Sequence, residues 1–363
     1  MKSAQSSNTP RGGLARKLGL SIATVAVALV LIELALRTRQ YLKHGSFGPM
    51  HVFVVDPKTG LELPPPGRVT KHFSINELGF RGPLVERPKP PGRLRLAFLG
   101  ASTTFCAEAT SEEASWPAQV AALVAQKLPA GTVDYVNAGV GGHRLEHMQI
   151  NLEHRVAPLD PDVIFIYEAT NDLGRDSRDL AIEQKVYTTH ADRKSWLGEL
   201  WLTWYLLDKN LLLGSRKQGA GGAVKEVTFE PRELSLKYRA RLESLCDSAK
   251  ARAKIVCLLT FSTQARRGQD PARLTEACNT SFYYMPYMSA ELLLDAFDEF
   301  NRVTREVAAE KGVLLLDIAT AVPGDREHFN DSVHFRDRGC AVFAAAVMEA
   351  LGEQPRWRQL IGL

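Results

Sequence analysis

A repeated alternation of short apolar runs and helix-like segments constrains the fold of this chain more than any other feature. The apolar runs are short and bounded by turn residues, which is typical of strands buried on both faces of a sheet. They occupy residues 94–100, 132–139, 162–169, 254–260 and 312–318. Segments with helical spacing occupy residues 115–128, 143–157, 236–252, 290–311 and 338–352. The alternation predicts a flavodoxin-like, three-layer α/β/α domain with a five-stranded parallel sheet.

The composition narrows the class of protein. The chain has 363 residues, of which 45% are hydrophobic and 24% charged, and these are ordinary values for a globular protein. Its formal net charge is only +4, and no long basic run is present, so we expect no nucleic-acid partner. The five cysteines contain no Cys-x-x-Cys pair, so neither a structural zinc site nor a redox motif is predicted, and most should be buried.

An apolar stretch near the N-terminus predicts a membrane anchor. Residues 18–36 contain a single charge, Glu33, and a helix of this length nearly spans a hydrocarbon core of about 30 Å. A cleaved signal peptide is less favoured because neither a shorter apolar core nor an A-x-A-like cleavage site at its end is obvious before Arg37, and a soluble helix would normally show a polar stripe. We therefore expect a cytoplasmic tail at residues 1–17 and a single-pass protein of the bacterial inner membrane, with its main domain on the extracytoplasmic side.

The remaining chain divides into a connecting region and one domain. Residues 37–92 are rich in Pro and Gly and are predicted to form a stalk and a leading segment, and residues 93–355 the domain. Two insertions at residues 185–231 and 278–289 interrupt the rhythm, and such insertions usually carry lids and substrate walls. Within the first, residues 196–213 are a helix on the core, an acyl-binding lid or a membrane-surface element.

Polar or glycine residues follow four of the predicted strands. In chain order they are Ser102, the turn from Gly139 to Gly142, Asn171, and Asp331 with His334 three residues later. Each has a structural explanation by itself, as a helix cap or a tight turn. Parallel sheets, however, form their sites at the carboxyl ends of strands, and an Asp three residues before a His can bind Nδ1 and leave Nε2 facing outward. The set predicts a nucleophilic site.

With these motifs, residues of about 94–351 resemble the SGNH (GDSL-type) hydrolase family, which includes esterases, lysophospholipases, thioesterases and carbohydrate O-deacetylases. The resemblance implies that Ser102 is the nucleophile and that His334 and Asp331 complete its triad. It also implies an oxyanion hole formed by the Ser102 N–H, Gly142 and Asn171, with Gly139 as the alternative glycine. The motif NELGFRG at residues 76–82 and the anchor resemble a membrane-tethered bacterial subgroup.

Two departures from the family pattern concern the shape of the site rather than its reacting groups. The first motif reads Gly-Ala-Ser instead of Gly-Asp-Ser, and Ala169-Thr170 replaces the frequent Gly-Gly or Gly-Thr before Asn171. The resemblance therefore implies a serine esterase that works through an acyl-enzyme and needs no metal or organic cofactor. Its substrate would be a small-molecule, lipid or glycan ester. The alternatives are O-acyl transfer to envelope glycans and a catalytically silent, membrane-tethered glycan-binding module; oligomeric state stays open.

Four further features have competing interpretations. His143, Glu146 and His147 match the H-x-x-E-H pattern of some zinc proteases, but the pattern is short and His143 directly follows the predicted oxyanion turn. We expect no metal there and expect His143 to line the substrate pocket. Tyr283 and Tyr284 form either an aromatic wall over the substrate or loop packing. His328, six residues before His334, is expected to be structural.

Overall fold

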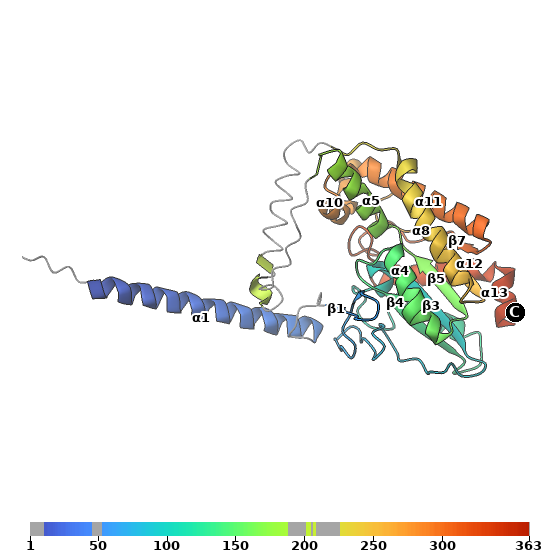
Figure 1. Ribbon diagram of the computed structural model, residues 1–363, viewed down its shortest axis with the longest axis horizontal. Coiled ribbons are helices and arrows are strands. Elements are labelled where there is room, and N and C mark those ends of the chain that lie inside the picture. The colour runs from blue at the N-terminus through green and yellow to red at the C-terminus, as the bar shows by residue number, and fades with distance from the viewer. Residues whose placement is uncertain (1–10, 46–52, 188–200, 205, 208–225, 363) are drawn as a thin grey trace, which may run out of the picture. The chain divides into compact units, whose positions relative to one another are not determined.

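The computed structural model describes residues 11–45, 53–187, 201–204, 206–207 and 226–362. Contacts divide the chain into two compact units, which are described separately (Figure 1). The smaller unit comprises Met1–His51 and Arg193–Leu212, and the larger one comprises Val52–Asp192 and Leu213–Leu363.

The larger unit is built on a five-stranded sheet in which every neighbouring pair is parallel. In spatial order its strands are β4 (Val133–Gly139), β3 (Leu94–Gly100), β5 (Val163–Tyr167), β6 (Ile255–Leu259) and β7 (Leu314–Leu316). This is the flavodoxin-like order, in which the first strand lies between the second and the third. The predicted sheet and fold class are confirmed. After β4 is added on one side of β3, the remaining strands are added on its other side, so the strand order reverses between β3 and β5. Ligands bind at such switch points in sheets of this kind.

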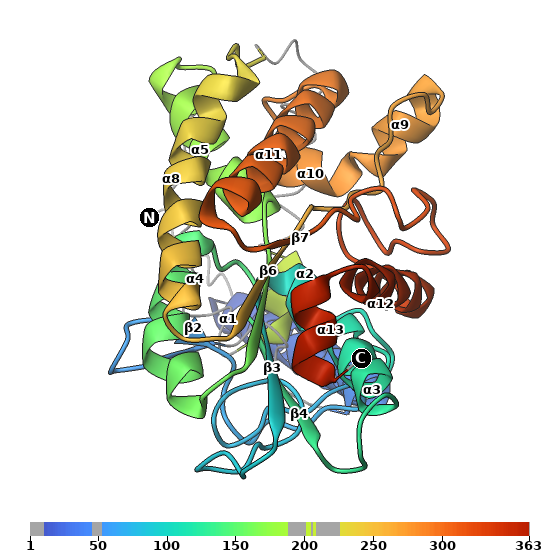
Figure 2. The ribbon, with the colours of Figure 1, turned by 90° about the vertical axis from the view of Figure 1, so that its right-hand side faces the viewer.

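Two helix layers cover the sheet, as Figure 2 shows in a view close to the sheet edge. One layer contains α3 (Trp116–Ala125), α12 (Asp337–Gly352) and α13 (Pro355–Ile361), and the other contains α4 (Leu145–Asn151), α5 (Thr170–Glu183), α8 (Pro231–Lys250) and α11 (Ala290–Lys311). Between them lies one apolar core that includes the fully buried, stacked rings of Phe98 and Phe165. All five cysteines are buried and free, as expected for small hydrophobic residues.

The helix predicted at residues 143–157 is shorter than expected. Helix α4 ends at Asn151 and continues as a π-helical turn, Leu152–Val156, and a 3₁₀ turn, Ala157–Leu159. Pro158 explains the change, because proline lacks an N–H donor and its ring clashes with the carbonyl four residues earlier in an α-helix.

The predicted stalk differs from the structure over residues 53–92. This region contains a small hairpin of β1 (Val54–Val55) and β2 (Glu62–Leu63), and its apolar side chains, such as Phe80 and Val85, join the core of the larger unit. Its glycines and prolines make turns that bring these side chains back to the domain, instead of an extended linker. At the other end, α13 extends the packed structure past residue 355 and buries Trp357.

The smaller unit contains helix α1 (Arg11–His44), which is longer than the apolar stretch predicted as the anchor. Its residues Arg16–Leu42 have a mean hydropathy of 2.4 in their most apolar window, and only 6% of that window is buried. Helix α1 is therefore long and apolar enough to span a membrane. The described residues of the 196–213 segment, which are residues 201–204, 206 and 207, belong to this smaller unit.

Candidate active site

Ser102 begins the four-residue helix α2 (Ser102–Phe105) directly after β3. The turn is so tight that a Cβ on Gly100 would lie 1.9 Å from Oγ1 of Thr104 and 2.8 Å from the carbonyl oxygen of Tyr167. Only glycine fits that position, and it allows the chain to turn from strand to helix within two residues. Ser102 is thereby held at the carboxyl edge of the sheet, with its N–H in the first turn of a helix, where N–H groups lack intrahelical partners.

The loop between β7 and α12 brings His334 to Ser102. Nε2 of His334 lies 2.8 Å from Oγ of Ser102, and Nδ1 lies 2.8 Å from Oδ2 of Asp331. Oδ1 of Asp331 also accepts the backbone N–H groups of Val333 and His334, each at 3.0 Å. These bonds close a tight turn that fixes the imidazole between the carboxylate and the hydroxyl, so Ser102, His334 and Asp331 form one hydrogen-bonded chain.

The charges around His334 favour its protonated form. Burial opposes the imidazolium, but the hydrogen bond to Asp331 and the negative charges of Glu108 and Asp331 outweigh it and raise the pKa of His334 to about 9. Burial likewise opposes ionisation of Asp331, whereas the bonds to His334 keep the pKa of this carboxyl below its ordinary value. The pair is therefore suited to hold the positive charge that a histidine acquires when it removes a proton from a serine.

Two of the predicted oxyanion donors follow β4 and β5, the strands on either side of β3. Gly142 has φ +78° and is exposed, and its N–H has no acceptor among the residues that the structure describes. One Nδ2 hydrogen of Asn171, in the first turn of α5, is donated to the carbonyl of His143 at 2.9 Å, which ties Asn171 to the Gly142 turn. The N–H of Gly139 already binds Oδ1 of Asn137 at 3.0 Å, so this alternative glycine is not available as a donor.

A buried carboxyl group supports the Asn171 turn. Oε1 of Glu168 accepts the Asn171 N–H at 2.6 Å, whereas Oε2 is buried with no partner among the described residues. Burial and the neighbouring charge of Asp172 raise the pKa of Glu168 well above its ordinary value. Glu168 was not singled out from the sequence; its position directly after a fully buried strand is the signal that could have found it.

Arg81, in the NELGFRG motif, is a second supporting residue that sequence reasoning missed. Its guanidinium is buried and donates to the carbonyls of Phe105 and Cys106, at the end of the helix that Ser102 begins. It also donates to the Ser111 carbonyl and pairs with Glu112, both at 3.1 Å. Through Arg81, the segment before β3 therefore stabilises the loop that follows α2, the helix that Ser102 begins. An arginine directly after the apolar Phe80 was the available signal.

The H-x-x-E-H pattern does not assemble a metal site. The His143 ring is buried against the His147 ring, with centroids 5.0 Å apart, and Nε2 of His143 lies 3.1 Å from the Glu62 carbonyl. Glu146 pairs instead with Arg144 at 3.4 Å. Among the residues described, no cluster of three or more His, Cys, Asp or Glu side chains could hold a metal ion. Burial and the charge of His147 lower the pKa of His143 to about 4, so this ring is neutral at physiological pH.

The second insertion is tied to the histidine turn. Oγ of Ser332 accepts the N–H groups of Thr280 and Ser281 at 3.0 and 3.2 Å, which joins helix α10 (Asn279–Tyr284) to the loop of Asp331 and His334. At the end of this short helix the Tyr283 ring is half-buried and the Tyr284 ring is 64% exposed. The two rings meet edge to face at 4.8 Å. They thus lie on an element attached to the site.

A second pair in the same loop repeats the histidine turn. Nδ1 of His328 lies 2.7 Å from Oδ1 of Asp325, which also accepts the His328 N–H at 3.1 Å. Asp325 precedes His328 by three residues, the same spacing as in the pair beside Ser102, and sequence reasoning overlooked it. The His328 ring is buried, and its carbonyl accepts the N–H of Arg336 at 2.8 Å, as expected for a structural residue.

Comparison with known proteins assigns the family. Residues 98–342 match the model of the GDSL-like lipase/acylhydrolase family. The chain belongs to this family, and it is an SGNH-type carboxylic ester hydrolase. The comparison with curated proteins gives no match.

A search of solved structures finds matches at low sequence identity. A variant of Axe2, an acetyl xylan esterase from Geobacillus stearothermophilus, is 20% identical with a TM-score of 0.44, and the match covers 71% of this chain and 94% of that one. Another Axe2 structure is 19% identical with a TM-score of 0.43, covering 73% and 95%. LAE5, an alpha/beta hydrolase from the metagenome of Lake Arreo in Spain, is 18% identical with a TM-score of 0.44, covering 71% and 95%.

Proposed function

We propose that this protein is a serine esterase in which Ser102 attacks the acyl carbonyl, His334 is the general base and Asp331 orients and stabilises the imidazolium. The observation that carries the proposal is the hydrogen-bonded chain from Asp331 through His334 to Oγ of Ser102, with both links at 2.8 Å. A nucleophile, a base within hydrogen-bond reach and a third group that orients the base are the parts needed for acyl transfer through a covalent intermediate.

The proposed reaction has two steps. Nε2 of His334 removes the proton of Ser102 as Oγ bonds to the carbonyl carbon, and the same proton then passes to the leaving alkoxide as the ester bond breaks. In the second step His334 takes a proton from water as the water oxygen bonds to the acyl carbon; the bond from that carbon to Oγ of Ser102 then breaks, Oγ takes the proton back from His334, and the acid is released. The N–H groups of Ser102 and Gly142 and the free hydrogen on Nδ2 of Asn171 bind the oxyanion in both steps.

The site geometry favours an active enzyme over the silent binding module. A silent module has no need to keep the hydroxyl and the imidazole in contact, whereas here Oγ of Ser102 and Nε2 of His334 are within the range required for proton transfer. The backbone N–H of Gly142, which lacks an acceptor among the described residues, further supports an oxyanion site. No observation favours acyl transfer to a glycan over hydrolysis.

We further propose that α1 anchors the protein in the bacterial inner membrane with the larger unit on the extracytoplasmic side. The length and hydropathy of α1 support a membrane span, and its apolar surface is almost entirely exposed in the chain alone. The substrate is then an ester of a small molecule, a lipid or a glycan that reaches this side of the membrane. Half-buried Tyr283 and exposed Tyr284, on the element joined to the histidine turn, are proposed to contact it.

The direct test is hydrolysis of p-nitrophenyl esters of increasing acyl length by the detergent-solubilised full chain and by Ser102→Ala. We expect hydrolysis that falls by about 10³-fold or more in the variant, since the nucleophile is lost and only binding and the oxyanion hole remain. The chain-length profile then separates an acetyl-sized pocket from a lipid-sized one. Equal rates for the variant and the parent would refute Ser102 as the nucleophile.

A further inference from the structure

Glu33, the one charged residue of the apolar stretch at residues 18–36, makes four polar contacts through its carboxylate. The Glu33 carboxylate accepts the N–H of Leu202 at 3.0 Å and binds Thr203 twice, through its N–H at 2.8 Å and its hydroxyl at 2.6 Å. It also pairs with Arg37, one turn further along α1, at 2.6 Å. The three contacts with Leu202 and Thr203 join two parts of the same unit that lie 169 and 170 residues apart in the chain.

This arrangement resolves a physical problem of the anchor. A carboxylate inside a membrane span costs several kcal/mol unless it is paired and hydrogen-bonded. The Glu33 side chain is only 13% exposed, and its oxygens receive two backbone N–H groups, a hydroxyl and a guanidinium. The N–H groups come from the start of a helical turn, where they would otherwise lack acceptors. The burial of the Glu33 carboxylate therefore depends on Leu202 and Thr203, and the burial of their N–H groups depends on Glu33.

The depth of the contact follows from the geometry of a helix. Glu33 lies three residues before the end of the apolar stretch at residue 36, a distance of about 4.5 Å along the axis. Leu202 and Thr203, which bind Glu33, are therefore level with the boundary between acyl chains and headgroups. Tryptophan is enriched at that boundary, and Trp201 and Trp204 directly flank the docked Leu202 and Thr203.

The exposure pattern of these residues matches a surface that meets lipid. We call residues 201–204, 206 and 207 the docked segment. Leu202 and Thr203 are buried at 4% and 8% exposure, whereas Trp201, Trp204 and Leu207 are 40%, 44% and 50% exposed. These large side chains would face water in a soluble protein. They instead continue the exposed apolar surface that α1 presents along its whole span.

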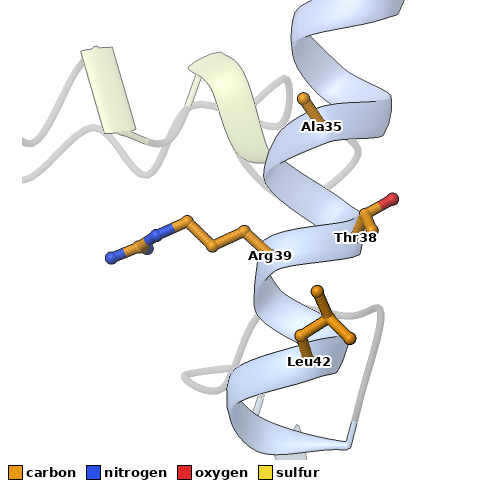
Figure 3. A pocket seen from close by; sticks show the side chains of 4 residues that line it. All are labelled: Ala35, Thr38, Arg39 and Leu42. Carbon is orange, nitrogen blue, oxygen red and sulfur yellow. The ribbon is translucent and has the colours of Figure 1, made fainter.

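A hollow on α1 adds to this surface just beyond the apolar stretch. It is lined by Ala35, Thr38, Arg39 and Leu42, and Figure 3 shows the Arg39 side chain extending away from the helix beside the apolar ones. Apolar side chains next to one guanidinium suit an acyl chain and its phosphate headgroup. The occupant that fits both the hollow and the docked segment is therefore a phospholipid bilayer at its interface.

From these contacts we infer that the docked segment is a second membrane-contacting element, seated at the lipid interface and held there by Glu33 of α1. The inference rests on the proposed membrane span of α1 but not on the esterase activity. It also means that the insertion between α5 and α8 contributes residues to the membrane interface.

Quenching of tryptophan fluorescence by phospholipids brominated on their acyl chains near the headgroup tests the inference on the full chain in vesicles. Trp196, the fifth tryptophan of the chain, is first replaced by Phe to give the parent protein of the assay. We expect strong quenching of this parent, most of which disappears when Trp201→Phe and Trp204→Phe are added. Trp116 and Trp357 are buried in the larger unit at 0% and 1% exposure and supply the unquenched reference. Equal fractional quenching of the parent and the double variant would overturn the inference.

The role of Glu33 is tested in the same assay. Glu33→Ala removes the acceptor of the docked segment, so the quenching due to Trp201 and Trp204 should fall, whereas Glu33→Gln, which keeps one carbonyl acceptor, should retain part of it. Thr24→Ala is the matched control, because the Thr24 hydroxyl binds only the Leu20 carbonyl within α1. Unchanged quenching in Glu33→Ala would contradict the proposed contact. Resistance of each variant to alkaline extraction from membranes separates a lost anchor from a lost docked segment.

Discussion

The loop between β7 and α12 contains the same turn twice, and only one copy contacts Ser102, the proposed nucleophile. In both copies an aspartate binds Nδ1 of the histidine three residues later and accepts that histidine's own N–H. Nε2 of His334 contacts Ser102, which lies 232 residues away in the chain. The Asp325 side chain is 50% exposed, whereas Asp331 is 21% exposed and lies in the site. In the His328 turn, the carbonyl of His328 instead accepts the N–H of Arg336, the residue before α12.

The comparison teaches that the Asp-x-x-His spacing builds the turn but does not assign its role. Both histidines acquire an oriented imidazole from local hydrogen bonds alone. The His334 turn lies at the carboxyl edge of β3, and this placement brings its imidazole into contact with the Ser102 hydroxyl. The two copies therefore provide matched variants in which the local chemistry is the same and the expected effect on catalysis is not.

The largest expected difference is between the two histidines. His334→Ala removes the base, so kcat/KM for a p-nitrophenyl ester should fall by about 10³-fold or more. His328→Ala should leave kcat/KM within a few fold and instead lower the free energy of unfolding by about 1–3 kcal/mol, because a buried, hydrogen-bonded side chain is lost. Steady-state kinetics and denaturant unfolding measure the two effects. A comparable loss of kcat in both variants would remove the functional distinction.

The two aspartates should differ in the same direction by a smaller factor. Asp331→Asn keeps the shape of the turn but no longer stabilises an imidazolium, and a loss of kcat on the order of 10³–10⁴ is expected for such a change. Asp325→Asn serves as the control and should keep nearly full activity. If Asp331→Asn retained the parent kcat, the aspartate would serve only to form the turn.

Asn171→Ala tests the opposite side of the site, where the oxyanion is proposed to bind. Removing one donor to the oxyanion typically costs about 10²–10³ in kcat, with little change in KM, because the donor acts mainly in the transition state. The same variant also loses the bond to the His143 carbonyl, so its unfolding transition should be measured in parallel. A rise in KM at constant kcat would show that Asn171 binds the substrate instead.

The smallest expected effect concerns pH. The base must be neutral to accept the Ser102 proton, and the pKa of His334 is raised to about 9, so kcat/KM should increase with pH up to a midpoint near this value. Glu108→Gln removes one of the negative charges that raise it, so the midpoint should move to lower pH. Each unit of decrease should give about a tenfold gain at neutral pH. His328→Ala should leave the midpoint unchanged. A shift of the midpoint in this variant would contradict the distinction between the two histidines.

The parts of the site that were predictable are those that follow buried strands. Ser102 and Asn171 could be placed at one sheet edge because β3 and β5 are short apolar runs, and the order of motifs then led to His334. Arg81 could not be found in this way, since the carbonyls it binds are brought to it only by the tertiary fold. For the same reason, the Pro- and Gly-rich region before β3 looked like a linker, although its apolar side chains complete the core.

The measurement that tests the central claim most directly is labelling of the full chain with a fluorophosphonate probe, followed by mass spectrometry of the peptides. The account predicts one adduct, on Ser102, which is absent in His334→Ala and Ser102→Ala and present at the parent level in His328→Ala. The phosphonate reacts only with a serine that its base has activated. An adduct on another residue, or labelling of Ser102 that persists without His334, would contradict the account.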